Sequence, residues 1–333
     1  MSTNSLNTKK AIYGFDLLKF ILALLIIAGH TSLFEEFSSL SLFRENLSSI
    51  AVPTFMAISA YLFFKKVYSK QESEETRVIL LKTVKRLAIL FICWYVLMLP
   101  MTYFKFFSVA TIKETFFAIF FSCTFTGYWF IKALLINTCI FYLCRRGKAL
   151  ILLTFFSWII YLFFSYNYIY HFIDFPYHPY YSFYYHLAYY SVGVLFARYG
   201  ECILKNHVNS LLVIAIWMLL LASCFFFDFA DPIYRLLSIP LLFIFFYQLD
   251  LEPKPYYKTM RDMSIILYMV QFVLIWLYNG ACDLWLQPDS MCYAVLQYSI
   301  TRFIVVTMVA IVIAWLILRY EKYPKCDFLH YLH

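Results

Sequence analysis

The stretch "DLLKFILALLIIAGH", residues 16–30, holds ten apolar or small residues between Lys19 and His30. Together with its neighbours it predicts a membrane-spanning helix over 14–34, because about 20 mostly apolar residues cross the hydrocarbon core as a helix. The two polar groups need an explanation, since ionisable side chains inside a span usually face the bundle interior or a water-filled cavity. What surrounds this segment therefore decides both fold and function.

The composition predicts a membrane protein along the whole chain. Of its 333 residues, 63% are hydrophobic and 14% are charged, whereas about 25% are charged in a typical soluble domain. We expect an all-α, polytopic helical bundle forming one integral-membrane domain over residues 1–333. The first span is expected to be retained, because no small-residue cleavage site follows it.

Ten spans account for the apolar stretches. They are predicted at 14–34, 47–64, 86–104, 128–144, 149–167, 183–198, 209–227, 233–249, 262–280 and 297–319. Residues 106–126 are also apolar, but an eleventh crossing there would invert every later loop. We therefore predict an interfacial or re-entrant helix for 106–126 on the outer side.

The basic residues predict which loops face the cytoplasm. With the N-terminus inside, the inner segments hold 20 of the 27 lysine and arginine residues: Lys9, Lys10, Lys65, Lys66, Lys70, Arg77, Lys82, Lys85, Arg86, Arg145, Arg146, Lys148, Arg198, Lys205, Lys254, Lys258, Arg261, Arg319, Lys322 and Lys325. Such a bias follows the positive-inside rule, so both termini are predicted to be cytoplasmic. The same rule explains the net charge of +8 without nucleic-acid binding.

Motifs of soluble enzymes and of metal sites are missing from the sequence. The nine cysteines form no CxxC or Cys/His pair with metal spacing, so no metal is expected. Cys282 and Cys292 leave open a disulfide in an outer loop. We find no phosphate-cradling glycine loop, GxSxG elbow or HExxH motif, and no acidic pair for glycoside hydrolysis.

Lys19 and His30 are eleven residues apart, which is three helical turns to within about 20°. They therefore project from one face of the helix, about 16 Å apart along its axis. Two interpretations remain open for this pair. Either the shared face lines an interior cavity, or Lys19 snorkels to the headgroups or pairs with Asp16 while His30 ends the span.

Five stretches together resemble the acyltransferase-3 family of integral-membrane O-acyltransferases. A Lys or Arg followed by His, as in Lys19 and His30, is typical of the family's first span. The other stretches are "VPTFMAISAYLFF" (52–64), "YWFIKALLI" (128–136), "YYSVGVLFARYG" (189–200) and "MSIILYMVQ" (263–271). Ala60 stands where the family usually has Gly, and Gln271 where it has His. The resemblance covers essentially the whole chain.

The resemblance implies transfer of an acyl group, commonly acetyl, from cytoplasmic acyl-CoA to a hydroxyl of an extracytoplasmic polysaccharide or lipid-linked glycan. It also implies a location in the inner membrane of a bacterium. His30 is the candidate base, because imidazole titrates near neutral pH; a covalent acyl-histidine is the open alternative. Lys19 is expected to bind the donor or to stabilise developing negative charge.

Other candidates carry less specific evidence. Lys82, Lys85 and Arg86 stand near a family Arg-x-x-Arg and are expected to bind the CoA phosphates, although positive-inside topology explains them equally. The resemblance implies that Ser59, Trp129, Lys132, Tyr268 and Gln271 line the cavity, with packing as the alternative. Arg302 and His186 are candidates as intramembrane ionisable groups, or else an ion-pair partner and a member of the aromatic belt.

Two other functions remain open. A transporter or flippase of lipid-linked glycans would also need many spans, but the sequence has no inverted repeat and only seven glycines to break helices. A non-catalytic relative is the third possibility, because Gln271 and the lysines at 82 and 85 depart from the family pattern. Saturable acyl-CoA binding would favour the acyltransferase over the transporter.

Overall fold

The computed structural model describes residues 12–102, 129–173, 179–200, 203–204, 208–249, 251–288 and 290–321. Within these ranges the chain is helical and has no strand, so the all-α prediction is confirmed. The elements are α1 (Tyr13–His30), α2 (Ser38–Ser49), α3 (Ala51–Tyr68), α4 (Ser73–Thr102), α6 (Trp129–Leu143), α7 (Gly147–Tyr170), the short helix η3 (Pro179–Tyr181), α8 (Leu187–Tyr199), α10 (Ser210–Ser223), α11 (Ala230–Gln248), α12 (Pro255–Trp285), α13 (Met291–Gln297) and α14 (Ser299–Tyr320).

Every predicted span coincides with a helix, although not every helix is long enough to settle the count. Among the described residues, six helical segments are long and apolar enough to cross a membrane: α1, α2 together with α3, α7, α11, α12 and α14. The other four predicted spans fall on α4, α6, α8 and α10. The number ten and the cytoplasmic termini therefore stay predictions, and residues 106–126 lie outside the described part of the chain.

Two helices extend well beyond their predicted spans, and one helix forms where an outer loop was expected. The span predicted at 86–104 belongs to the 30-residue α4, and the one at 262–280 belongs to the 31-residue α12. Hydropathy marks only the apolar part of a helix, whereas the Glu, Leu, Lys and Arg residues that open α4 are strong helix formers in water as well. The unexpected helix is α2.

The packing of α3 against α8 forms the centre of the molecule. Most of α3 is buried, including Ala57 and Ala60. A Cβ atom on Gly193 of α8 would lie 2.0 Å from the carbonyl oxygen of Ala57 and 2.8 Å from the Cβ of Ala60. Small residues at such a crossing let two helix backbones approach closely in a membrane. This explains why Ala60 is tolerated but a side chain at 193 is not.

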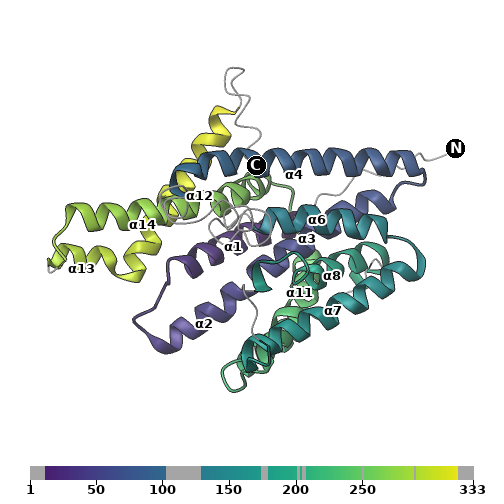
Figure 1. The fold of residues 1–333 in the computed structure, drawn as a ribbon, viewed down its shortest axis with the longest axis horizontal. Helices are drawn as coiled ribbons and strands as arrows, with labels where there is room; N and C mark the ends of the chain where they lie inside the picture. The colour runs from purple at the N-terminus through teal and green to yellow at the C-terminus, as the bar shows by residue number, and fades with distance from the viewer. Residues whose placement is uncertain are drawn as a thin grey trace.

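Helix α1 lies between this central pair and the C-terminal helices. It packs against α3 on one side and against α12 and α14 on the other. In Figure 1, α12 and α14 extend from one side of α1, while α7, α8 and α11 lie on the opposite side. The face of α1 that carries Lys19 and His30 is thus bordered by helices from both halves of the chain.

Candidate active site

His30 occupies the last position of α1 and lines a pocket of about 340 Å³. The centroid of its imidazole ring lies 4.6 Å from that of the Phe272 ring on α12. The residue keeps an exposed surface, so the imidazole is held by packing and is still reached from the pocket. This is the arrangement that a general base needs, because its nitrogen must contact the reacting hydroxyl.

One face of α12 forms the rest of the pocket. Its lining residues are Phe272, Ile275, Trp276, Asn279, Gly280 and Asp283. Successive members are one or three positions apart, which places them along one side of a helix. Asn279 Oδ1 is buried and has no hydrogen-bond partner among the described residues. An aromatic ring beside an amide and a carboxylate is a combination suited to a ligand rich in hydroxyl groups.

Sequence reasoning missed Trp276, Asn279 and Asp283. They lie at and beyond the end of the predicted ninth span, after the last residue matched to the family pattern, Gln271. A signal was present, because polar residues appear at helical spacing after Phe272. Asp283 also accepts a hydrogen bond from the Tyr293 hydroxyl at 3.0 Å, which connects α12 to α13.

Lys19 lies at the other end of α1 in a cluster of charges from three helices, which we call the inner charge cluster. Lys19 interacts electrostatically with Asp16 on α1, with Arg261 and Asp262 on α12 and with Arg86 on α4. Asp16 is buried, and Arg261 Nε donates to Asp262 Oδ1 at 2.9 Å. Among the described residues, the cluster holds three cations and two carboxylates, so the net charge of these five side chains is positive. The interaction of Lys19 with Asp16 is one of the alternatives that the sequence left open for Lys19.

The three basic residues predicted to bind phosphate are all exposed on α4. Of Lys82, Lys85 and Arg86, it is Arg86 that interacts electrostatically with Lys19. Arg261 takes part in the same cluster, although the sequence suggested only a role as a cytoplasmic flank of the ninth span. The structure therefore brings one predicted phosphate ligand and one unpredicted arginine towards Lys19.

A series of aromatic contacts links other predicted residues to His30. The ring centroids of Phe130 and Tyr268 lie 5.3 Å apart, and those of Tyr268 and Phe272 lie 6.5 Å apart. The Phe272 ring in turn contacts His30. Tyr268 is thus one ring removed from the imidazole. The series runs from α6 across α12 to α1, so it forms a continuous wall next to the pocket.

Trp129 packs on His186 rather than on the pocket. The two rings are stacked with centroids 4.6 Å apart, and both residues are buried. His186 Nε2 lies 2.6 Å from the carbonyl oxygen of Tyr180, which fixes the ring. The pair therefore joins α6 to the segment before α8 and is separate from the surface that His30 lines.

The remaining predicted residues lie in helix interfaces. Gln271 is fully buried, and its Nε2 donates to the carbonyl oxygen of Tyr268 at 3.0 Å. Its Oε1 has no partner among the described residues. Ser59 on α3 and Lys132 on α6 are half-buried, and neither lines the His30 pocket.

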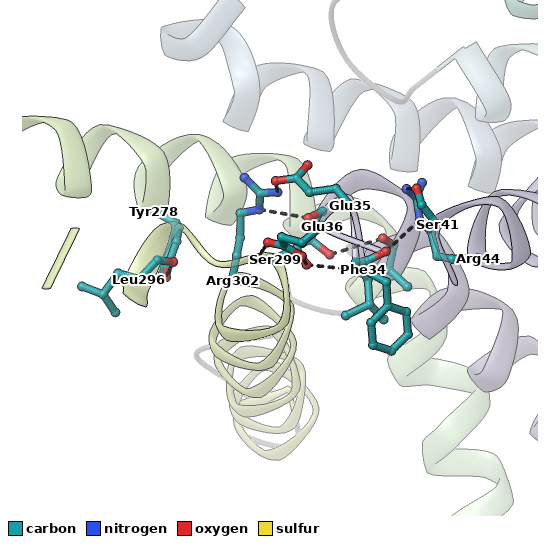
Figure 2. A network of polar contacts seen from close by, with 12 residues as sticks. Phe34, Glu35, Glu36, Ser41, Arg44, Tyr278, Leu296, Ser299 and Arg302 are labelled. Atoms are coloured by element: carbon teal, nitrogen blue, oxygen red, sulfur yellow. Dashed lines mark hydrogen bonds and ion pairs between the residues drawn. The ribbon is translucent and has the colours of Figure 1, made fainter. Parts of the chain in front are cut away.

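Arg302 belongs to a group of polar contacts that we call the polar clamp, formed by Glu35, Glu36, Ser299 and Arg302. Arg302 Nε donates to the carbonyl oxygen of Thr31 at 2.9 Å, and its Nη2 lies 3.0 Å from Glu35 Oε1. Figure 2 shows how these side chains join the loop after α1 to the first turn of α14. The sequence left open an ion-pair role for Arg302, and the structure shows this ion pair with Glu35.

Glu36 makes the second half of the polar clamp. The backbone N–H of Ser299 donates to Glu36 Oε1 at 2.7 Å, and the Ser299 hydroxyl donates to Oε2. Desolvation raises the pKa of the carboxyl, but the Ser299 hydrogen bonds and the Arg302 charge outweigh it and hold the pKa below its usual range. The backbone N–H of Phe34 also donates to Ser299 Oγ. The loop that follows His30 is therefore fixed to α14.

The disulfide that the sequence left open is not formed. Cys282 is a buried free thiol, and Cys292 is an exposed one. The connection between α12 and α13 is instead made by the Tyr293–Asp283 hydrogen bond described above. The exposed Cys292 therefore remains available for chemical labelling.

Comparison with known families gave a match that spans nearly the whole chain. The family model Acyl_transf_3, described as an acyltransferase domain, matches residues 12–319. The chain belongs to this family. Family membership, together with the apolar helices, identifies a multi-pass membrane acyltransferase. No match was found among curated proteins or among solved structures.

Proposed function

We propose that the chain transfers an acetyl group from cytoplasmic acetyl-CoA to a hydroxyl of an extracytoplasmic polysaccharide or lipid-linked glycan in the inner membrane of a bacterium. The observation that carries the proposal is the arrangement of α1. At one end of this helix His30 lines an open pocket, and at the other Lys19 lies in a net positive charge cluster. Donor and acceptor are thus assigned to opposite ends of one helix.

His30 acts as the general base in this proposal. An imidazole nitrogen accepts the proton of the acceptor hydroxyl while its oxygen forms a bond to the thioester carbonyl carbon. The carbon–sulfur bond then breaks, and the leaving thiolate takes the proton back from the imidazolium. The products are an acetyl ester and free CoA, so every atom is accounted for and His30 returns to its neutral form.

The inner charge cluster attracts the negatively charged donor. Lys19, Arg86 and Arg261 supply positive charge from three helices, and Lys82 and Lys85 extend that charge along the exposed side of α4. Lysine and arginine both bind phosphate, arginine with two parallel hydrogen bonds. The reactive thioester must still reach His30, roughly 16 Å away along the axis, a distance that the thin pantetheine arm of CoA is suited to cover.

The acceptor occupies the pocket between His30 and α12. Trp276 offers a flat apolar surface for a sugar ring, while Asn279 and Asp283 offer hydrogen-bond acceptors for its hydroxyls. The unpartnered oxygen of Asn279 supports this assignment, because a buried polar atom without a hydrogen bond costs free energy until a ligand supplies one.

The test compares acetylation by the wild-type protein and by His30→Ala. Membranes containing each are supplied with labelled acetyl-CoA, and ester-linked label is measured on extracted glycan. We expect a loss of at least about 100-fold, the usual contribution of a positioned general base. His171→Asn is the matched control, because His171 is an exposed histidine at the end of α7 with a positive φ that Asn tolerates.

Two results would contradict the proposal. Unchanged ester formation in His30→Ala would remove His30 from the chemistry. Glycan movement across the membrane without any release of CoA would favour a flippase instead, and saturable acetyl-CoA binding with no acceptor-dependent CoA release would indicate a non-catalytic relative.

A further inference from the structure

A second pocket, away from His30, is formed by the ends of five helices. It has a volume of about 210 Å³ and lies where α3 ends, α4 begins, α6 turns into α7 and α8 ends. Its polar lining comprises the cations Lys70, Arg145, Arg146 and Arg198 and the uncharged residues Tyr68, Gln71 and Thr76. These segments belong to three loops predicted to be cytoplasmic. We call this the four-cation pocket.

The charge of the four-cation pocket is largely uncompensated. Lys70 pairs with Glu75 at 3.2 Å. For Arg145, Arg146 and Arg198 the described residues contain no carboxylate within ion-pair distance. The positive-inside rule explains basic residues in these loops, but it does not require three loops to converge on one cavity. Three guanidinium groups without a carboxylate partner around one cavity form a suitable binding site for an anion.

Two of the guanidinium groups are held in place by the protein itself. Arg198 Nη1 donates to the carbonyl oxygen of Arg145 at 2.6 Å, and Arg145 Nη1 donates to the carbonyl oxygen of Tyr142 at 2.8 Å. Arg145 also lies over the Tyr142 ring at 3.9 Å. Each guanidinium has five N–H donors, so most of them are left for a ligand. Little side-chain freedom remains to be lost on binding.

The first turn of α7 adds to the positive field. Arg146 is its N-cap residue and makes no side-chain cap hydrogen bond. The exposed N–H groups and the dipole of a 24-residue helix favour an anion at this end. Gly147, the first residue of α7, has φ +58 with nothing within 4 Å of its Cβ position, so there is open space beside the first turn of α7.

We propose that the four-cation pocket binds a phosphate mono- or diester at the predicted cytoplasmic face. Its volume is several times the roughly 30 Å³ of a liquid water molecule, which suits a phosphate or diphosphate group. Two sources present this chemistry there: the nucleotide phosphates of acyl-CoA and the headgroup of an anionic phospholipid. The nucleotide source rests on the proposed function, whereas the lipid source does not.

The experiment compares Arg146→Gln with Lys148→Gln in the full-length purified protein. The two residues are exposed, lie on the same turn and lose the same charge, but of the two only Arg146 lines the pocket. One arm titrates adenosine 3′,5′-bisphosphate calorimetrically into protein in uncharged detergent. The other arm measures phosphatidylglycerol retained by the protein from mixed phosphatidylglycerol–phosphatidylcholine nanodiscs, by native mass spectrometry.

If the ligand is a nucleotide, we expect Arg146→Gln to weaken bisphosphate binding at least about tenfold, because a charged hydrogen bond is lost. Lys148→Gln should leave this binding unchanged. If the ligand is a lipid, we expect Arg146→Gln to retain less phosphatidylglycerol than Lys148→Gln, while bisphosphate binding is unchanged in both variants. If Arg146→Gln and Lys148→Gln behave alike in both arms, the inference is wrong. No arm measures acyl transfer, so the outcome is separate from that of the His30 test.

Discussion

Among the residues that line the His30 pocket, Trp276 has the largest side chain. It is 38% exposed on α12. We expect Trp276→Leu to raise the KM for the acceptor about tenfold, because an aromatic contact contributes ~1 kcal/mol or more. The kcat should change little, since stacking acts on the ground state and transition state alike. Initial rates at varied acceptor concentration measure the two constants.

The matched control for this prediction is Trp315→Leu, because Trp315 is an exposed tryptophan on α14 outside the pocket. An equal rise of KM in both variants, or a fall confined to kcat in Trp276→Leu, would contradict an acceptor-binding role for Trp276.

Glu36 gives the polar clamp a dependence on pH. Its pKa is held below the usual value in the folded protein, so its contribution to stability is complete above the ordinary carboxyl pKa of about 4.3. That contribution is lost as the pH falls through the lower, folded-state pKa. We expect Glu36→Gln to unfold roughly 1–3 °C lower at neutral pH and to show a weaker dependence on acid.

Thermal unfolding in detergent between neutral and acidic pH checks this prediction. Glu72→Gln is the control, because Glu72 is an exposed carboxylate before α4 and should leave the pH dependence as in the wild type. A wild-type slope in Glu36→Gln would show that the polar clamp does not depend on this carboxylate.

At the residue scale, the sequence pointed to candidate site residues where one helix carried the information. Lys19 and His30 were found because a charge or an imidazole is conspicuous within an apolar span. Asn279 and Asp283 were missed because polar residues at the end of a span are ordinary. Arg261 was missed because the positive-inside rule already explained it. What separates these cases is tertiary contact with α1, which a single sequence does not contain.

At the scale of elements, the α3–α8 crossing depends on Gly193. A Cβ there would lie 2.0 Å from the Ala57 carbonyl oxygen, so the two backbones must separate to admit it. We expect Gly193→Ala to destabilise the protein by ~1–3 kcal/mol, the usual cost of overpacking. Urea or thermal unfolding of the purified protein measures the loss.

Gly280→Ala serves as the control for stability, because a Cβ at that position meets nothing within 4 Å. If both variants unfold at the wild-type temperature, the close approach of α3 and α8 is not a constraint on the fold.

Helix existence followed from the sequence more reliably than helix length. The apolar spans marked the cores of α1, α3 and α12 because hydropathy records what is buried in lipid or protein. It did not mark the first three turns of α4 or the polar start of α12, where helix propensity and Pro255 at the N-terminus extend the helix beyond the apolar part. The helix α2 was missed for the same reason.

For the molecule as a whole, the predicted topology assigns the two candidate sites to opposite faces of the membrane. In this predicted topology, the His30 pocket and Cys292 lie on the outer side. The four-cation pocket and Ser69 lie on the inner side. In a background without other cysteines, we expect Cys292 to react at least about tenfold faster than Ser69→Cys with an impermeant maleimide on intact spheroplasts. Both residues are exposed, so access to each depends on the face.

Permeabilised spheroplasts give the control, since both cysteines should then react alike. Faster labelling of Ser69→Cys on intact spheroplasts would invert the topology, and with it the proposed direction of acyl transfer.

The four-cation pocket shows what the sequence leaves out at this scale. The sequence assigned each of its cations to a predicted inner loop, but the residues lie far apart along the chain, from Lys70 to Arg198. Their convergence depends on how α3, α6 and α8 pack together, and no periodic pattern within one segment records that packing. The residue classes were therefore predictable, whereas the cavity was not.

The polar clamp joins a loop near the start of the chain to Ser299 and Arg302, about 265 positions later. During translation, the loop after His30 is made before α14. It therefore lacks its partners Ser299 and Arg302 until α14 has been made. A chain that stops before α14 contains His30 but lacks the contacts that fix the loop after it. The anchoring of the loop after His30 is therefore complete only once Ser299 and Arg302 of α14 have been synthesised.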